Sequence, residues 1–324
     1  MWFRNLQLYR LDEKFTLTPE QLAARLADDR FRSCGKMDMV SSGWTPPLGR
    51  HGEQPVHAAS GFILICLRRE EKLMPATVIR RLLEDKVVAI ETAEQREVYR
   101  REKMRLKEEI IVDLLPRALS RITNLFAYID TRNSMLVVDS ASAGKAEALI
   151  TQLRHSLDRL PLTPLQTEQS LSARMTRWLE GAPLPAGFGL GEECELRHPD
   201  ADGSTATCRH QDLGAAEVRQ HIKAGKRAVR LALQWRERLG FVLHEDLSIR
   251  RLRFEDIVRE AEKDTQADDP VSRFDLDFSL MVLELAEFLP QLLQAVGVTA
   301  TAPQADARAA DSTAAVEVEE PEPA

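Results

Sequence analysis

The sequence predicts an α+β fold for this 324-residue chain. Segments with the two-residue alternation of strands occur as hairpin pairs separated by short turns. Segments with helical spacing form separate runs between these pairs, an arrangement typical of antiparallel sheets with added helices. The chain is 44% hydrophobic, which is enough to bury a sizeable core.

The first elements are a strand and a capped helix. Residues 3–11 alternate like a strand, and a helix is expected to start at Pro19 with Thr18 as its N-cap. Residues 33–55 contain so many Gly, Pro and Ser that no regular structure is expected there. The apolar segment 61–69 is predicted to be a buried strand.

A long helical region and a hairpin follow. Residues 74–122 have mostly helical character, with an interruption expected near Pro116. Residues 126–142 predict two strands around a turn at 131–133. A further helix is expected over 142–157.

The second half begins after a connector at 160–169, the best candidate for a domain boundary. Three helices, a hairpin and three consecutive strands are expected beyond it. In chain order these are a helix at 170–180, a hairpin at 192–210, a helix at 213–224 with Gly225 as its C-cap, strands at 227–235, 240–244 and 249–254, and an amphipathic helix at 275–295.

The charge is distributed unevenly. The net charge is −7, yet the stretch 218–236 holds six Lys or Arg and no acidic residue. Residues 300–324 carry six acidic side chains and one basic, a net charge of −5, so the rest of the chain carries −2. This tail has no large apolar side chain beyond valine and is expected to be disordered.

The basic side chains of 218–236 are expected to face solvent. Within 227–235 the apolar residues occupy one face, which must be core, so the other face presents Arg230 and leads to Arg236. Arg219 and Lys223 lie one helical turn apart. With the preceding hairpin they form a predicted patch for polyanions, although a merely solvated surface is the alternative. Its members are Arg209, Arg219, Lys223, Lys226, Arg227, Arg230 and Arg236, with His210 of the hairpin and Arg250, Arg251 and Arg253 of the third strand beside them.

A second basic cluster lies in the long helical region. Spacings of three and four residues are expected to place Arg96, Arg100, Lys103 and Lys107 on one helix face, and Arg117 follows. Acidic residues are interleaved here, so this cluster is also consistent with a solvated helix.

No catalytic signature, metal site or cofactor site is predicted. The P-loop, GxSxG and HExxH motifs are missing from the sequence. The glycine-rich run that begins at Gly187 is expected to be a loop. Four potential zinc ligands share a predicted hairpin, but their spacing matches no common zinc pattern. They are Cys194, His198, Cys208 and His210.

Asp275 and Asp277 could serve a metal-dependent nuclease, but they are expected to precede the last helix and to interact with its dipole. The sequence has no apolar run long enough for a transmembrane helix and no signal peptide, so a cytoplasmic protein is expected.

Seven segments together resemble the RdgC family of recombination-associated proteins. They fall in the family's order and cover residues 1 to about 297, leaving out the tail. They read "MWFRNLQLYRL", "CGKMDMVSSGWTPPLG", "EEKLMPATVI", "LLPRALSR", "VDSASAGKAE", "HIKAGKRAVRLALQW" and "RFDLDFSLMVLELA".

The resemblance implies a nucleoid-associated protein that binds double- and single-stranded DNA without sequence preference. It implies a head-to-head, ring-shaped homodimer whose basic hole admits duplex DNA and which antagonises RecA-mediated strand exchange. Such a protein is not an enzyme and needs no cofactor. Under this interpretation the basic stretch 218–236 faces the DNA.

The resemblance also implies an elongated, horseshoe-like monomer of antiparallel sheets and helices. The expected division is a centre domain at 1–75 and 121–165, a helical finger domain at 76–120, a base domain at 166–299 and the acidic tail. Leu119 would meet its mate across the dimer at the finger. Some family members have an aromatic residue at this position, so the contact could differ in packing.

Two other functions fit the residues. One is a metal-dependent nuclease or phosphoesterase that uses Asp275 and Asp277 or the Cys and His set. The other is a scaffold whose partner is an acidic protein. Magnesium-dependent cleavage would favour the first, and capture of an acidic partner without DNA binding would favour the second.

Overall fold

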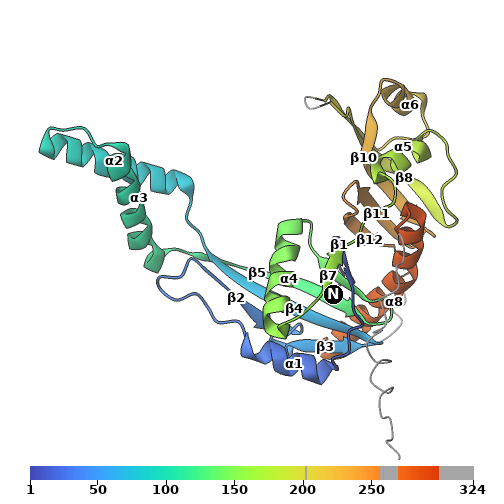
Figure 1. Ribbon diagram of the computed structural model, residues 1–324, viewed down its shortest axis with the longest axis horizontal. Coiled ribbons are helices and arrows are strands. Elements are labelled where there is room, and N and C mark those ends of the chain that lie inside the picture. Colours follow the sequence, from blue (N-terminus) through green and yellow to red (C-terminus); the bar gives the residue numbers. More distant parts are fainter. Residues whose placement is uncertain (201–202, 256–257, 259–268, 299–324) are drawn as a thin grey trace, which may run out of the picture.

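The computed structural model describes residues 1–200, 203–255, 258 and 269–298, and it has an α+β fold (Figure 1). The predicted acidic tail therefore lies outside the described residues. The described helices are α1 (Pro19–Asp28), α2 (Ala76–Glu94), α3 (Arg100–Leu114), α4 (Ala143–Leu157), α5 (Leu171–Leu179), α6 (Ala216–Lys223) and α8 (Pro270–Val296). None of them is both long and apolar enough to cross a membrane.

All strand pairings within the sheet are antiparallel. The strands are β1 (Leu6–Leu11), β2 (Val40–Thr45), β3 (Val56–Ala59), β4 (Phe62–Lys72), β5 (Ser120–Asp130), β6 (Met135–Asp139), β7 (Leu162–Pro164), β8 (Phe188–Arg197), β9 (Thr205–Arg209), β10 (Arg227–Trp235), β11 (Leu239–His244) and β12 (Ile249–Phe254). Their order is β2-β4-β5-β6-β1-β12-β11-β10-β8-β9, with β3 beside β4 and β7 beside β1. The two halves of the sheet meet at β1 and β12, where Leu6 is opposite Ile249.

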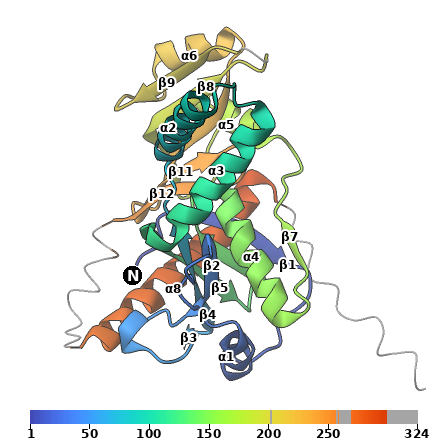
Figure 2. The same ribbon diagram turned by 90° about the vertical axis from the view of Figure 1, so that its left-hand side faces the viewer.

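Apolar side chains cover both faces of the central strands. Leu22 of α1 and Leu149 of α4 belong to the core on one face. Phe278 and Leu285 of α8 belong to the core on the other face, which continues into the second half of the chain. Figure 2 shows α4 and α8 on opposite sides of the central strands. The alternation of strand residues therefore supplies two cores from one sheet.

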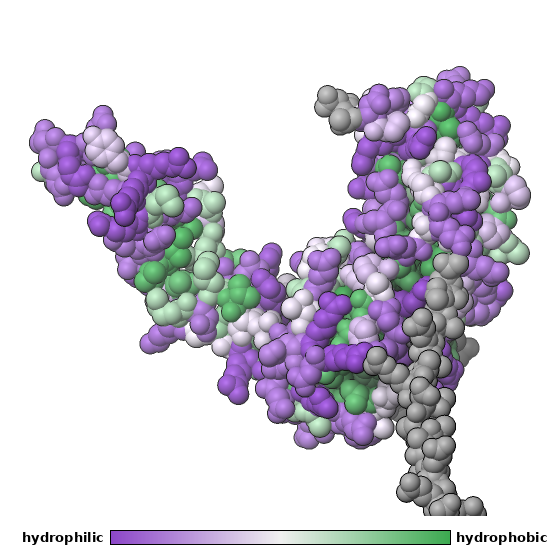
Figure 3. All heavy atoms as spheres, viewed as in Figure 1, coloured by the Kyte–Doolittle hydropathy of each residue, from purple (hydrophilic) through white to green (hydrophobic). Residues whose placement is uncertain are grey.

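Two arms project from the central part on the same side. α2 and α3 form one, here called the helical arm, and β8 to β12 with α5 and α6 form the other, here called the sheet arm (Figure 1). The helical arm has a small core of its own around Val87, Val98 and Leu106. An open gap separates the arms in the space-filling view (Figure 3). The division into centre, finger and base domains remains a prediction.

Several predicted elements are confirmed. Thr18 caps α1, and its hydroxyl oxygen accepts a hydrogen bond from the Gln21 N–H at 3.3 Å. The buried strand at 61–69 is β4, and β5 and β6 flank the turn at 131–133. Gly225 follows α6 with φ 90°, a conformation that suits glycine.

Two expectations of irregular structure are wrong. Residues 33–55 include β2, which pairs with β4 over its whole length. Gly43 allows this because a side chain there would lie 2.5 Å from the Phe31 Cα, so the small residue serves close packing rather than a loop. The run that begins at Gly187 enters β8, and Gly189 is paired with Gln234 of β10.

The helical region does end near Pro116, as expected, but it also contains an earlier break that was not expected. α2 ends at Glu94, Gln95 caps it with φ 54°, and α3 begins only at Arg100. Near Pro116 the chain makes one 3-10 turn, Leu115–Arg117, and then enters β5 at Ser120. The helices fold back on each other because Val87 of α2 and Leu106 of α3 share a core, a tertiary contact that local propensity does not reveal.

Candidate nucleic-acid interface

Four basic residues surround the junction of α6 and β10 and are here called the corner cluster: Arg219, Lys223, Lys226 and Arg227. α6 buries Val218 and Ile222, so Arg219 and Lys223 are on its exposed side. The Lys226 Nζ donates a hydrogen bond to the Ser204 hydroxyl at 2.7 Å.

The start of β10 is fixed in place. The Ala228 N–H donates to the Thr176 hydroxyl of α5 at 2.9 Å, and Ala228 is fully buried. Among described residues, no carboxylate lies within 4.0 Å of a corner-cluster cation. These side chains therefore keep their full charge for an external anion.

Four other arginines of the sheet arm are engaged with two glutamates of β8. Glu193 pairs with Arg251 at 2.6 Å and with Arg209 at 3.6 Å. Glu195 pairs with Arg230 at 2.8 Å and with Arg197 at 3.1 Å. This group of six residues is here called the paired face.

The two glutamates are held firmly. The side chains of Glu193 and Glu195 are 24% and 13% exposed. The hydrogen bond from Arg251 lowers the pKa of Glu193, so that carboxylate is ionised at neutral pH. An arginine that left the paired face for a phosphate would leave a largely buried carboxylate with one of its two cations, which is unfavourable.

Arg236 is separate from both groups. β10 has nine residues, so it lies roughly 30 Å from the corner cluster along the strand. Its guanidinium binds Glu287 of α8 and lies 4.9 Å from the centre of the Trp235 ring. The residues expected to form one patch therefore fall into two groups. The corner cluster has no carboxylate partner among the described residues, whereas Arg209, Arg230 and Arg236 are paired with glutamates. The strand itself confirms the prediction, since Arg230 is exposed and Leu231 and Leu233 are buried.

The helical arm also contains both paired and unpaired cations among its described residues. Arg96 lies outside α3 and binds Glu94 at 2.6 Å and Glu102 at 2.7 Å, so the expectation that it shares a helix face with Arg100 is wrong. Arg100, Lys103 and Lys107 remain on α3, exposed and, within the described residues, without a carboxylate partner. Arg117 is exposed in the 3-10 turn after α3.

Leu119 is 77% exposed. It begins a group of exposed apolar residues at the outer ends of β2, β4 and β5. The backbone N–H of Leu73 donates to the Leu119 carbonyl at 2.7 Å, and that of Lys72 donates to the Met39 carbonyl at 2.8 Å. This distal apolar patch comprises Met37, Met39, Val40, Leu73, Leu119 and Ile122. The sequence does not predict that Met37 and Met39 belong to an apolar surface, because they lie in the segment expected to be irregular.

The potential metal ligands of the second half are dispersed. Cys194 and Cys208 are opposite each other on β8 and β9, both buried, and burial raises the pKa of Cys194 to about 12. His198 lies 3.1 Å from Asp200 instead. The described residues contain no cluster of three or more His, Cys, Asp or Glu side chains suited to a metal ion.

Asp275 and Asp277 lie inside α8, which starts five residues before Asp275, so the expectation that they precede the helix is wrong. Asp275 is 3.1 Å from His57 Nε2, and Asp277 binds the N-terminal ammonium of Met1. The two carboxylates therefore have different structural partners.

A family model described as "Putative exonuclease, RdgC" matches residues 1–299. The chain belongs to the RdgC family. The "Recombination-associated protein RdgC" of Aeromonas hydrophila is 44% identical over 297 residues, 92% of this chain and 98% of that relative. Proteins of the same name from Yersinia pestis and Yersinia pseudotuberculosis are 41% identical with the same coverage. The RdgC match excludes the acidic tail.

Proposed function

We propose that this chain binds double- and single-stranded DNA without sequence preference, encloses duplex DNA as a ring-shaped homodimer of horseshoe-like monomers, and restrains RecA-mediated recombination. One observation carries the proposal. Cations without a carboxylate partner among the described residues occupy both arms, namely the corner cluster on the sheet arm and Arg100, Lys103 and Lys107 on the helical arm. An open gap separates the arms (Figures 1 and 3).

Lysine and arginine contacts to phosphates give affinity but carry no base information. Binding of this kind releases counterions, so it depends steeply on salt. Arg117 at the end of the helical arm would add to the same surface. The paired arginines, Arg209, Arg230 and Arg236, contribute less because each already has a carboxylate partner.

The distal apolar patch supports self-association. Exposed apolar groups of this kind mark interaction surfaces, and a two-fold axis would bring the same patch of both copies together. Leu119, the most exposed of them, would contact its mate. Two open monomers joined at both arms would then enclose a hole.

The role in recombination is supported by the names of the relatives. We place the protein at the nucleoid in the cytoplasm, without a cofactor and without hydrolytic activity. The family description mentions an exonuclease. The separate partners of Asp275 and Asp277 favour binding over metal-dependent cleavage.

Topology of the DNA tests enclosure. The protein is bound to nicked circular and to linear duplexes of the same sequence, washed with high salt and quantified. A ring is retained on the circle and slides off the linear duplex, whereas equal loss from both contradicts enclosure. Cleavage of either DNA with Mg²⁺ would support the nuclease alternative, and absence of DNA binding would support the scaffold.

Leu119→Asp tests the dimer contact. It places two like charges together at the two-fold axis and should reduce retention on circular DNA, with little change in melting temperature because Leu119 is exposed. A large loss of stability would show that Leu119 is core. Inhibition of RecA strand exchange by the parent but not by this variant would link enclosure to recombination.

A further inference from the structure

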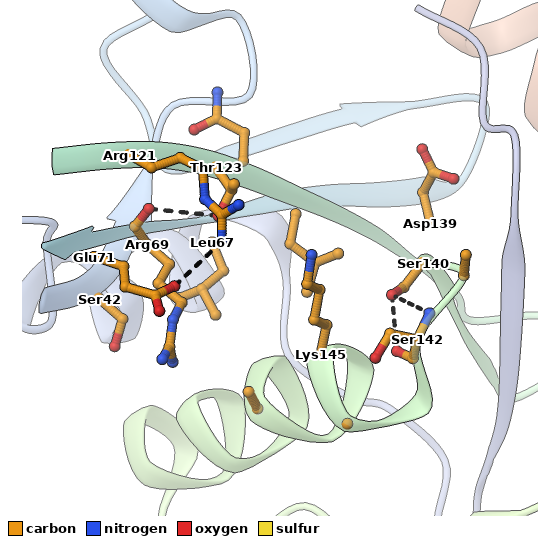
Figure 4. A pocket seen from close by; sticks show the side chains of 15 residues that line it. Ser42, Leu67, Arg69, Glu71, Arg121, Thr123, Asp139, Ser140, Ser142 and Lys145 are labelled. Atoms are coloured by element: carbon orange, nitrogen blue, oxygen red, sulfur yellow. Dashed lines mark hydrogen bonds and ion pairs between the residues drawn. The ribbon is translucent and has the colours of Figure 1, made fainter. Parts of the chain in front are cut away.

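A hollow of about 510 Å³ lies between the outer halves of β4 and β5 and the first turns of α4 (Figure 4). α4 stands between the two arms (Figure 1). The loop before α4 and its first turn contain "DSASAGKAE", one of the segments that resemble the RdgC family. No function has been assigned to it so far. We call this cavity the α4 hollow.

Cationic side chains enter the α4 hollow from three elements. They are Arg69 of β4, Arg121 of β5 and Lys145 of α4. No described carboxylate lies within 4.0 Å of Arg69 or Lys145, whereas Arg121 is 3.5 Å from Glu71. That pair is exposed on both sides, so it is weak and can be exchanged for another anion. Figure 4 shows Lys145 reaching from α4 toward the strands.

The first turn of α4 adds hydrogen-bond donors. Ser142 at the N-cap makes no capping hydrogen bond with its side chain, and the Ser140 hydroxyl is engaged with the backbone of Ser142. The N–H groups of Ala143, Gly144 and Lys145 have no acceptor among the described residues. Small side chains leave these donors open, and the helix dipole favours an anion beside them.

The two acidic side chains that line the hollow do not oppose an anion there. Glu71 is paired with Arg121. Asp139 accepts hydrogen bonds from the N–H groups of Arg4 and Asn5 at 3.0 and 2.9 Å, and it points away from Lys145 (Figure 4). Burial also raises the pKa of Asp139. The uncompensated charge of the hollow is therefore positive.

One wall is apolar. Leu67, Leu125 and Ala148 line it, so a group larger than a bare ion fits beside the cations. A sugar attached to a phosphate has this combination of an apolar face and an anionic end.

We propose that the α4 hollow is a phosphate-binding site for a nucleic-acid strand, with Lys145 and Arg69 supplying charge and the first N–H groups of α4 supplying hydrogen bonds. The source of the phosphate rests on the proposed function. An internal phosphodiester and a terminal phosphate share this chemistry, and the experiment separates them.

The amide of Gly144 reports on the site directly. The full chain is labelled with ¹⁵N-glycine, and the Gly144 resonance is identified by its loss in Gly144→Ala. Inorganic phosphate, then single-stranded oligonucleotides with a 5′-phosphate or a 5′-hydroxyl, are titrated at constant ionic strength. We expect a saturable shift of the Gly144 resonance with each of them and not with chloride. A stronger shift with the 5′-phosphate identifies a terminal phosphate, and equal shifts identify the internal backbone.

Substitutions at Gly144 separate binding from stability. A Cβ there would meet nothing closer than the Ser142 hydroxyl at 4.0 Å, so a side chain fits. Gly144→Asp places a negative charge in the first turn of α4, where it interacts favourably with the helix dipole, so the melting temperature should stay the same or rise. The same charge repels phosphate, so oligonucleotide binding should weaken. Gly144→Ala should bind like the parent. Lys145→Gln should lower the salt slope of DNA binding by about 1, and Lys14→Gln, also an exposed lysine, should leave it unchanged.

The outcomes are distinct from those of the proposed function. A protein that binds DNA while the Gly144 resonance ignores phosphate and oligonucleotides, with Gly144→Asp binding normally, overturns the α4 hollow and leaves DNA binding intact. A resonance that responds to inorganic phosphate in a chain that binds no DNA overturns the proposed function and leaves the anion site intact.

Discussion

The corner cluster and the paired face lie on one arm and have similar basic content, but they present different charge. Arg219, Lys223, Lys226 and Arg227 have no carboxylate nearby among the described residues, whereas Arg230 binds Glu195 at 2.8 Å. The glutamates of β8 that bind Arg230 and Arg251 precede them in the chain by 35 and 58 residues. A basic run in sequence is therefore not the same as a basic surface, because antiparallel pairing brings distant residues into register.

The largest effect is expected from removing charge at the corner cluster. Lys226→Ala with Arg227→Ala should weaken DNA binding roughly 10-fold at low salt and lower the salt slope by about 1 for each lost phosphate contact, for any sequence. Titration of unrelated duplexes at several salt concentrations measures this. The matched double change Arg209→Ala with Arg230→Ala should lower the slope far less. Equal salt slopes for both double variants would contradict the proposed difference between the corner cluster and the paired face.

An effect of opposite sign is expected from the paired face. Glu195→Gln removes a carboxylate that holds Arg230 and Arg197. Arg197 keeps Glu245 at 3.8 Å, whereas Arg230 loses its carboxylate partner. The freed Arg230 should tighten DNA binding several-fold at low salt and steepen its salt dependence. Glu180→Gln, an exposed residue at the end of α5, makes the same charge change without freeing an arginine. If both variants gain equally, only the net charge matters and the internal pairs are irrelevant.

The helical arm offers a smaller test of the same rule. Lys103→Gln and Arg96→Gln each remove one positive charge, but only Arg96 has carboxylate partners in the described structure. We expect roughly 2- to 3-fold weaker DNA binding for Lys103→Gln with a lower salt slope, and an unchanged slope for Arg96→Gln. A reversed order would show that Arg96 leaves its glutamates for DNA.

The smallest effect concerns stability against pH. Because the folded-state pKa of Glu193 is lowered, its pairing stabilises the fold above the ordinary glutamate pKa of about 4.3 and ceases to do so as pH falls through the folded value. The melting temperature of Glu193→Gln should therefore lie below that of the parent at pH 7 and converge with it in acid, once pH has fallen through the folded value. Glu192→Gln, an exposed neighbour, should match the parent throughout. A difference that persists below that transition would indicate lost packing instead.

Much of the fold follows from local patterns in the sequence. The alternation in 227–235, the capping pair of Thr18 and Gln21 and the glycine after α6 each define an element through neighbours a few residues away. β2 was missed because glycine and proline normally mark loops, yet here the missing side chain of Gly43 admits the backbone of Phe31.

The α+β class, most of the elements and the residues of β10 that point away from the core follow from the sequence alone, because these depend on spacing along one segment. Which cations are free depends instead on contacts between distant segments. Glu193, Glu195 and Glu287 reach their arginines across strands or from α8, and Arg69, Arg121 and Lys145 meet in one hollow although 76 residues separate the first from the last. Coulomb attraction depends on the distance between charges in space, and this distance cannot be inferred from their separation along the chain.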